Sequence, residues 1–76
     1  MYKIYINETV VILAESVPAM LENYNELQLE HFNFIQFYNQ VKLETLANTY
    51  LLLTPDFKDL FKEIKNSFKL IKAAGG

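Results

Sequence analysis

The sequence predicts a small α+β domain, or a small α/β domain, in which helices pack on a single sheet. Three observations carry this prediction: an alternating segment at residues 2–7, unbroken apolar segments at residues 10–14 and 50–53, and an amphipathic segment at residues 57–68. The first pattern is typical of a half-buried strand, the second of buried strands and the third of a helix. Strands separated by helices favour a sheet with some parallel pairing.

The chain opens with a predicted β-hairpin. Residues 2–7 alternate, which places one set of side chains on the core face of the sheet: Tyr2, Ile4 and Ile6. Asn7 begins a short polar break, and asparagine tolerates the positive φ of a tight turn. The apolar residues 10–14 follow, and their β-branched content predicts a strand that is covered on both faces.

A short helix is predicted after the hairpin, over residues 17–25. Ser16 is a suitable cap for such a helix, and Pro18 suits its first turn. A short apolar stripe follows, formed by Ala19, Met20, Leu21 and Tyr24. These signals together favour a helix that begins directly after the second strand.

The middle of the chain is ambiguous, because residues 26–38 fit either a helical face or a strand. The aromatic and β-branched content of residues 33–38 favours a strand. A short helix is then predicted over residues 42–48. Residues 50–53 predict a further buried strand.

The last third has the clearest boundary. Thr54 is a hydroxyl cap, Pro55 suits the first helical position and Asp56 places a carboxylate in the first turn. One helical face is apolar and consists of Phe57, Leu60, Phe61, Ile64 and Phe68. The helix is predicted to end near residues 66–67, and residues 69–74 are predicted to form the last strand.

Composition limits the class of protein. A chain of 76 residues with 51% hydrophobic and 21% charged residues is typical of one globular domain. The absence of cysteine excludes disulfides and cysteine zinc sites. All seven basic residues are lysines and the net charge is −2, which disfavours nucleic-acid recognition. No basic and apolar leader opens the chain and no apolar run could span a bilayer, so we expect a cytoplasmic protein without a membrane partner.

The C-terminal segment resembles a join between two domains. Residues 68–76, with the sequence Phe-Lys-Leu-Ile-Lys-Ala-Ala-Gly-Gly, are similar to the entry into the catalytic domain of some bacterial Nudix hydrolases. In those proteins a small N-terminal region ends in a helix, and an Ala-Ala-Gly-Gly segment opens the first catalytic strand. Residues 2–7, with a second short strand close behind, also resemble the start of those proteins.

This resemblance implies that residues 1–72 form an accessory N-terminal domain and that residues 73–76 begin a downstream catalytic domain. The Nudix signature needs a glycine, an arginine and paired glutamates that hold a divalent metal beside a diphosphate. This chain has no arginine and no paired glutamates, and its only glycines are Gly75 and Gly76. We therefore expect no catalytic, cofactor-binding or metal-binding residue in this chain, and we assign magnesium to the parent's catalytic domain. The expected partners are that domain and a second copy of the chain in a homodimer.

Four groups of side chains carry chemistry, and for each the structural role is favoured over the functional one. The only histidine, His31, lies beside Glu30, and adjacent residues point in different directions, which disfavours a shared metal. The other functional alternatives are an anion-binding stripe, a cation site on a helical face and a stacking platform for nucleic acid. The anion-binding stripe would consist of Lys58, Lys62, Lys65, Lys69 and Lys72. The cation site would consist of Glu22, Glu26 and Glu30, and the stacking platform of Phe32, Phe34, Phe37 and Tyr38.

Three functional hypotheses follow from the sequence. The first is the accessory domain of a Nudix-type hydrolase that cleaves nucleoside diphosphate derivatives. The second is a free-standing module that binds another protein through an apolar face, since five Tyr and six Phe are difficult to bury in so short a chain. The third, and weakest, is a nucleic-acid binder whose affinity would vanish with modest salt.

Overall fold

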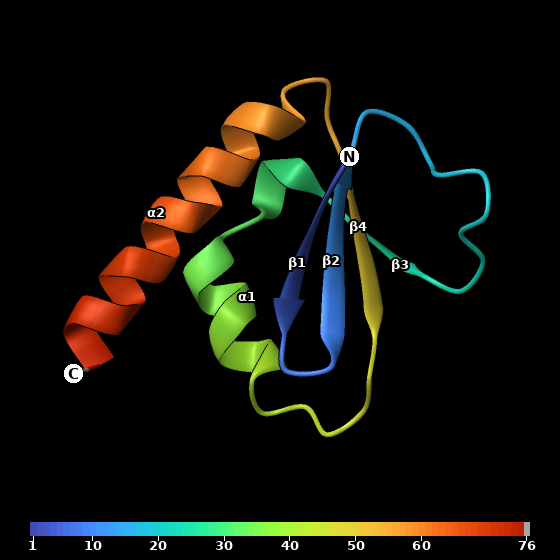
Figure 1. Cartoon of the computed structure of the whole chain (residues 1–76). Coiled ribbons are helices and arrows are strands. Elements are labelled where there is room, and N and C mark those ends of the chain that lie inside the picture. The colour runs from blue at the N-terminus through green and yellow to red at the C-terminus, as the bar shows by residue number, and fades with distance from the viewer. Residues whose placement is uncertain (76) are drawn as a thin grey trace.

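The computed structural model describes residues 1–75 of the chain, and the side chains of residues 1–70. Within these residues a four-stranded sheet has the order β1-β2-β4-β3. The strands are β1 (Tyr2–Ile6), β2 (Thr9–Ala14), β3 (Asn25–Leu27) and β4 (Thr49–Leu53). Two helices, α1 (Phe34–Val41) and α2 (Phe57–Gly75), lie on one side of this sheet (Figure 1). The predicted α+β class with an opening hairpin is confirmed.

The hairpin forms as its alternation predicts. β1 pairs with β2 in antiparallel register, with Ile4 opposite Val11, and Asn7 adopts a φ of 55° in the connecting turn. Only residues that tolerate the left-handed region fit such a turn without strain, and asparagine is one of them. Ile4 and Ile6 are buried, whereas Tyr5 is exposed on the opposite face.

Two parallel pairings complete the sheet. β4 lies between β2 and β3 and runs parallel to both, with Leu13 opposite Leu52 and Leu27 opposite the same residue on the other side. The predicted strand at residues 50–53 is therefore confirmed. Because β2 and β4 are the two inner strands, their side chains are enclosed on both faces, as continuously apolar segments require.

Each face of the sheet has its own core. The face under the helices buries Ile4, Ile6, Val11, Leu13, Leu52, Phe34, Val41 and Ile64. The second face buries Ile12, Ala14 and Leu51, and Leu21 and Tyr24 pack against them. Leu21 and Tyr24 belong to residues 15–24, which Figure 1 shows on the side of the sheet away from the helices.

The helix predicted over residues 17–25 is wrong, because residues 15–24 form neither helix nor strand and Asn25 begins β3. β2 and β3 both run parallel to β4, so this segment must carry the chain back along the full length of the sheet. A nine-residue helix spans only about 13 Å, whereas a five-residue strand spans about 17 Å. An irregular, more extended path covers the distance and also places Leu21 on the second face.

The strand predicted over residues 33–38 is also wrong, because these residues begin α1. The side chain of Asn33 accepts a hydrogen bond of 3.1 Å from the backbone N–H of Gln36, which caps the helix. Phe34 and Val41, seven residues apart, lie on the buried face. Residues 26–38 thus divide between a short strand, a 3₁₀ turn at Leu29–His31 and a helix.

The helix predicted over residues 42–48 is absent, since α1 ends at Val41 and a loop leads to β4. Leu43 and Leu46 are 78% and 75% exposed. Most helical stability in proteins comes from packing an apolar face, and the apolar residues of this segment have no such surface beneath them. The predicted helix is therefore wrong because the tertiary structure offers its apolar residues no surface to pack on.

The final helix begins as predicted. The hydroxyl of Thr54 accepts a hydrogen bond of 3.2 Å from the backbone N–H of Asp56, and the regular helix starts at Phe57. Its predicted apolar face is confirmed: Ile64 is buried, and Phe57, Leu60, Phe61 and Phe68 pack partly buried against the same core.

The end of α2 differs from the prediction. The helix does not stop at residues 66–67, and the strand predicted over residues 69–74 is wrong because α2 continues to Gly75. The hydroxyl of Ser67 donates a hydrogen bond of 3.1 Å to the carbonyl of Glu63, one turn earlier. This hydrogen bond gives the serine hydroxyl a partner inside the helix, so the helix continues past Ser67.

Replacing Asn33 tests whether α1 depends on its cap. Asn33→Ala removes the bond to Gln36 and should lower the free energy of unfolding by about 1 kcal/mol, measured by urea denaturation. Asn39→Ala, at an exposed position inside the same helix, is the matched control and should be neutral or slightly stabilising because alanine favours helices. Equal losses in both variants would contradict the cap.

Replacing an inner-strand leucine tests the core. Leu52→Ala should lower the free energy of unfolding by about 2–5 kcal/mol, because Leu52 is fully buried and the substitution leaves a cavity. Leu43→Ala makes the same chemical change at a site that is 78% exposed and should change stability by less than about 0.5 kcal/mol. Similar effects at the two sites would contradict this assignment of the core.

Candidate functional site

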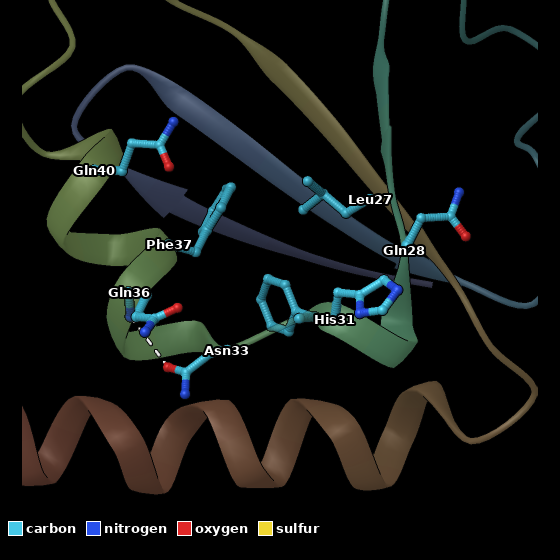
Figure 2. Close-up of a pocket in the computed structure, with 8 residues that line it drawn as sticks. Leu27, Gln28, His31, Asn33, Gln36, Phe37 and Gln40 are labelled. Atoms are coloured by element: carbon cyan, nitrogen blue, oxygen red, sulfur yellow. Dashed lines mark hydrogen bonds between the residues drawn. The ribbon is translucent and has the colours of Figure 1, made fainter.

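The candidate site is a groove between the end of β3 and α1, with a volume of about 310 Å³. Leu27 and Phe37 face each other across it (Figure 2). Phe32 also lines the groove, and these three apolar side chains form its floor. The rings of Phe32 and Phe37 are tilted, with centroids 5.6 Å apart. Phe37 in turn meets the edge of Tyr50 on β4 at 5.0 Å, which ties this floor to the sheet. We call this feature the amide groove, for the polar side chains on its rim.

The rim of the amide groove carries four carboxamide side chains and one imidazole: Gln28, Asn33, Gln36, Gln40 and His31. Gln36 and Gln40 are four residues apart on α1, so their side chains share one face of the helix. Asn33 already accepts the capping bond from Gln36, as the dashed line in Figure 2 shows. A carboxamide both donates and accepts hydrogen bonds, so this rim suits an uncharged polar ligand such as a peptide main chain.

His31 lies on the rim of the amide groove and is exposed. Glu30, its neighbour in the 3₁₀ turn, is exposed as well and does not line the groove. Within the part of the chain that the structure describes, no group of three or more His, Cys, Asp or Glu side chains could hold a metal ion. The interpretation of His31 as a solvated imidazole agrees with this placement.

The three glutamates whose four-residue spacing is compatible with one helical face lie on three different segments instead. Glu22 belongs to the irregular segment, Glu26 to β3 and Glu30 to the 3₁₀ turn. All three are exposed. The helical face that would have gathered them is therefore not formed, and the prediction that they are solvated is confirmed.

The lysines of α2 are exposed where their side chains are described: Lys58, Lys62, Lys65 and Lys69. Lys72 lies outside the residues whose side chains the structure describes. The ammonium nitrogen of Lys65 lies 5.4 Å from the centre of the Phe61 ring, within reach of a cation–π interaction. A solvated helical face, as predicted, accounts for this stripe.

The aromatic residues predicted to form core do so. Phe34 is buried, and Phe32, Phe37 and Tyr38 are partly buried against the same cluster. The ring of Phe68 on α2 meets Phe34 edge-on at 4.9 Å, which joins the two helices. Edge-to-face packing of this kind stabilises a core.

A polar cluster at the start of β4 was not found from the sequence. The phenol of Tyr50 donates a hydrogen bond of 3.3 Å to one carboxylate oxygen of Glu44, and the side chain of Asn48 donates one of 2.7 Å to the other. The backbone N–H of Asn48 also donates to the hydroxyl of Thr9 at 3.4 Å. Glu44 and Asn48 lie on the loop that was predicted as a helix. Their four-residue spacing was the only feature of the sequence that indicated a contact between their side chains.

This polar cluster changes the chemistry of Tyr50. Burial raises the pKa of the Tyr50 phenol above its ordinary value of 10.0, and the negative charge of Glu44 and its hydrogen bond raise the pKa further. The neutral phenol is therefore the form that the fold favours. The cluster holds the loop of residues 42–48 against β2 and β4, a structural role.

Comparison with known protein families, with curated proteins and with solved structures found no match to this chain. None of the helices that the structure describes is both long and apolar enough to cross a bilayer. The site must therefore be interpreted from its own geometry.

The raised pKa of Tyr50 predicts how stability changes at high pH. The unfolded chain loses the Tyr50 proton at a lower pH than the folded chain, so the free energy of unfolding should fall as the pH rises from 10.0 through the folded pKa. Tyr50→Phe should reduce this dependence of the free energy of unfolding on pH, measured by urea denaturation at a series of pH values. Glu44→Gln should flatten it in part, whereas Glu8→Gln in the hairpin turn should leave it unchanged. A slope in Tyr50→Phe equal to that of the natural chain would contradict the prediction.

Proposed function

We propose that this chain is the non-catalytic N-terminal accessory domain of a Nudix-type hydrolase that cleaves nucleoside diphosphate derivatives. In this proposal it packs on the catalytic domain that follows it, and thereby helps that domain to dimerise or shapes its substrate pocket. The family assignment rests on the similarity of residues 68–76 to the join found in such proteins. The docking role rests on the distribution of exposed apolar side chains.

That distribution is the observation that carries the docking role. Met20 is 92% exposed, and Leu43 and Leu46 are also mostly exposed. Single exposed apolar side chains are normal, but grouped ones mark contact surfaces in soluble domains. Here two groups lie at opposite ends of the sheet, and each is a candidate for contact with another domain.

The first group lies near the N-terminus. Met1 and Phe57 line a hollow of about 440 Å³ together with residues of the irregular segment, among them Pro18. Val17 and Met20, on the same segment, are exposed beside it. We call this group the N-terminal apolar surface.

The second group consists of Leu43 and Leu46 on the loop after α1. The side chain of Asn7 donates a hydrogen bond of 3.5 Å to the carbonyl of Lys42, so this loop lies beside the hairpin turn at the other end of the sheet. The polar cluster around Glu44 holds the loop in place. A fixed loop with two exposed leucines is a pre-formed contact surface, because little side-chain and backbone order remains to be gained on docking.

The course of α2 bears on where the catalytic domain would begin. The helix continues through residues 73–75, which were predicted to begin the first catalytic strand. The proposal therefore attaches the downstream domain to the C-terminal end of a helix. Figure 1 shows that end far from the N-terminus of the chain.

A second candidate function is a free-standing module that binds another protein. The same exposed leucines fit it, because an apolar contact surface does not by itself identify its partner. The two candidates differ in solution behaviour. A stand-alone module would bind an unrelated protein without any downstream domain, whereas the accessory domain would bind within its own polypeptide.

The proposal predicts where hydrolytic activity resides. Incubated with Mg²⁺ and a set of nucleoside diphosphate derivatives, the 76-residue chain should release no product, whereas the polypeptide extended by the sequence encoded after Gly76 should do so. Hydrolysis by the short chain would overturn the accessory role. A downstream sequence without acidic magnesium ligands would overturn the family assignment.

The two apolar surfaces can be separated by substitution in the extended polypeptide. Leu43→Ser combined with Leu46→Ser, or Met20→Ser, should increase hydrogen exchange at whichever surface docks, because domain contact protects it. In the isolated chain each change should alter stability by less than about 0.5 kcal/mol, since these side chains are exposed. Lys62→Ser on the exposed side of α2 is the control. Unchanged exchange at both surfaces would remove the docking role.

A further inference from the structure

The edge of the sheet beside the amide groove is open. β3 is an outer strand and pairs only with β4 among the strands that the structure describes. The main-chain groups on its other side therefore have no strand partner. Unpaired edge strands present a row of N–H and C=O groups on which an extended peptide can add as a further strand. Asn25 and Glu26 are exposed on this strand.

A helix wall accompanies this open edge. Leu27, the last residue of β3, lies on one side of the amide groove, and Gln36 and Gln40 on α1 lie on the other (Figure 2). Among the groove residues drawn in Figure 2, the carboxamides of Gln36 and Gln40 make no hydrogen bond, and the dashed line to Asn33 begins at the backbone N–H of Gln36. These groups can therefore donate to and accept from a peptide main chain.

We propose that the amide groove binds an extended peptide, which adds to the free edge of β3 as a fifth strand. Alternate side chains of the peptide point toward the floor formed by Phe32 and Phe37, because side chains alternate along a strand. The carboxamides of Gln36 and Gln40 bind the peptide main chain from the helix side. This role does not depend on the proposed place of the chain beside a hydrolase.

Charge selects the peptide. The open edge and the segments around it carry Glu22, Glu26 and Glu30, all exposed, and the sequence has no lysine or arginine between residues 4 and 41. None of the side chains that line the groove is a lysine or an arginine. A groove with an acidic border and no lysine or arginine on its rim favours a ligand with positive charge. The occupant is therefore an extended segment in which apolar residues alternate with lysine or arginine.

An alternating valine-lysine heptapeptide, acetylated and amidated at its ends, is the direct probe. Added to ¹⁵N-labelled protein, it should shift the amide resonances of residues 25–28 and 36–40 in a saturable manner. The same peptide with glutamate in place of lysine should bind at least about fivefold more weakly. Saturable shifts confined to other residues, or no shifts at millimolar peptide, would overturn the proposal.

Two N-methylated versions of the peptide test strand addition itself. In one version every odd residue is methylated on its backbone nitrogen, and in the other every even residue. Because only every second N–H of an added strand points to its neighbour, one version should lose binding and the other should keep most of it. Equal binding of both versions would overturn the proposed mode.

A charge-reversal variant tests the site on the protein. Glu26→Lys should weaken binding of the valine-lysine peptide about fivefold and strengthen binding of the glutamate peptide. Glu8→Lys makes the same change in the exposed hairpin turn and should leave both affinities unchanged. Equal effects of the two variants would show that net charge alone is responsible and would overturn the proposed site.

Discussion

The parallel pairing of β2 with β4 is the constraint on which the rest of this structure depends. Leu13 and Leu52 are paired across it and are fully buried, as are Val11 and Leu51. These four side chains, which point to both faces of the sheet, are removed from water, so both faces must be covered. A parallel pair also cannot be joined by a tight turn. The chain segment that joins two parallel strands must therefore cross one face of the sheet, and it covers that face as it does so.

The two faces are covered by unequal means, and this explains where the molecule offers surfaces. On one face α1 and α2 interlock through aromatic rings such as Phe34 and Phe68. On the other face an irregular segment contributes only Leu21 and Tyr24. A segment that must extend to span the sheet cannot also turn all of its apolar residues inward, so Met20 remains exposed. The amide groove arises in the same way, since α1 leaves part of the β3 edge uncovered.

The polar cluster at the start of β4 shows how the remaining loop is fixed without an apolar core beneath it. The carboxylate of Glu44 accepts hydrogen bonds from the side chains of Tyr50 and Asn48. The main chain of Asn48 also contacts β2, because its carbonyl accepts a hydrogen bond of 3.0 Å from the backbone N–H of Val10. Partly buried hydrogen bonds to a carboxylate are stronger than those between neutral groups. They replace the apolar packing that Leu43 and Leu46, which are exposed, do not supply.

The sequence by itself determined the elements whose signals are local. The alternation of Ile4 with Tyr5, the turn at Asn7 and the cap at Thr54 each depend on neighbours within a few residues, and each was predicted correctly. The aromatic composition of residues 33–38 was misleading, because strand propensity largely reflects side-chain packing, and a helix here buries Phe34 against Phe68 of α2. The spacing of Gln36 and Gln40 had meaning only once that helix was known.

Tertiary structure decided the remainder, because the deciding distances lie between segments that are far apart in the chain. The length of sheet that residues 15–24 must cross follows from the position of β4, which comes later in the sequence. The position of the amide groove depends equally on β3 and α1 together. Local propensity amounts to less than about 1 kcal/mol per residue, whereas burying one large apolar side chain contributes about 1.5–3 kcal/mol. Packing therefore prevails wherever the two disagree.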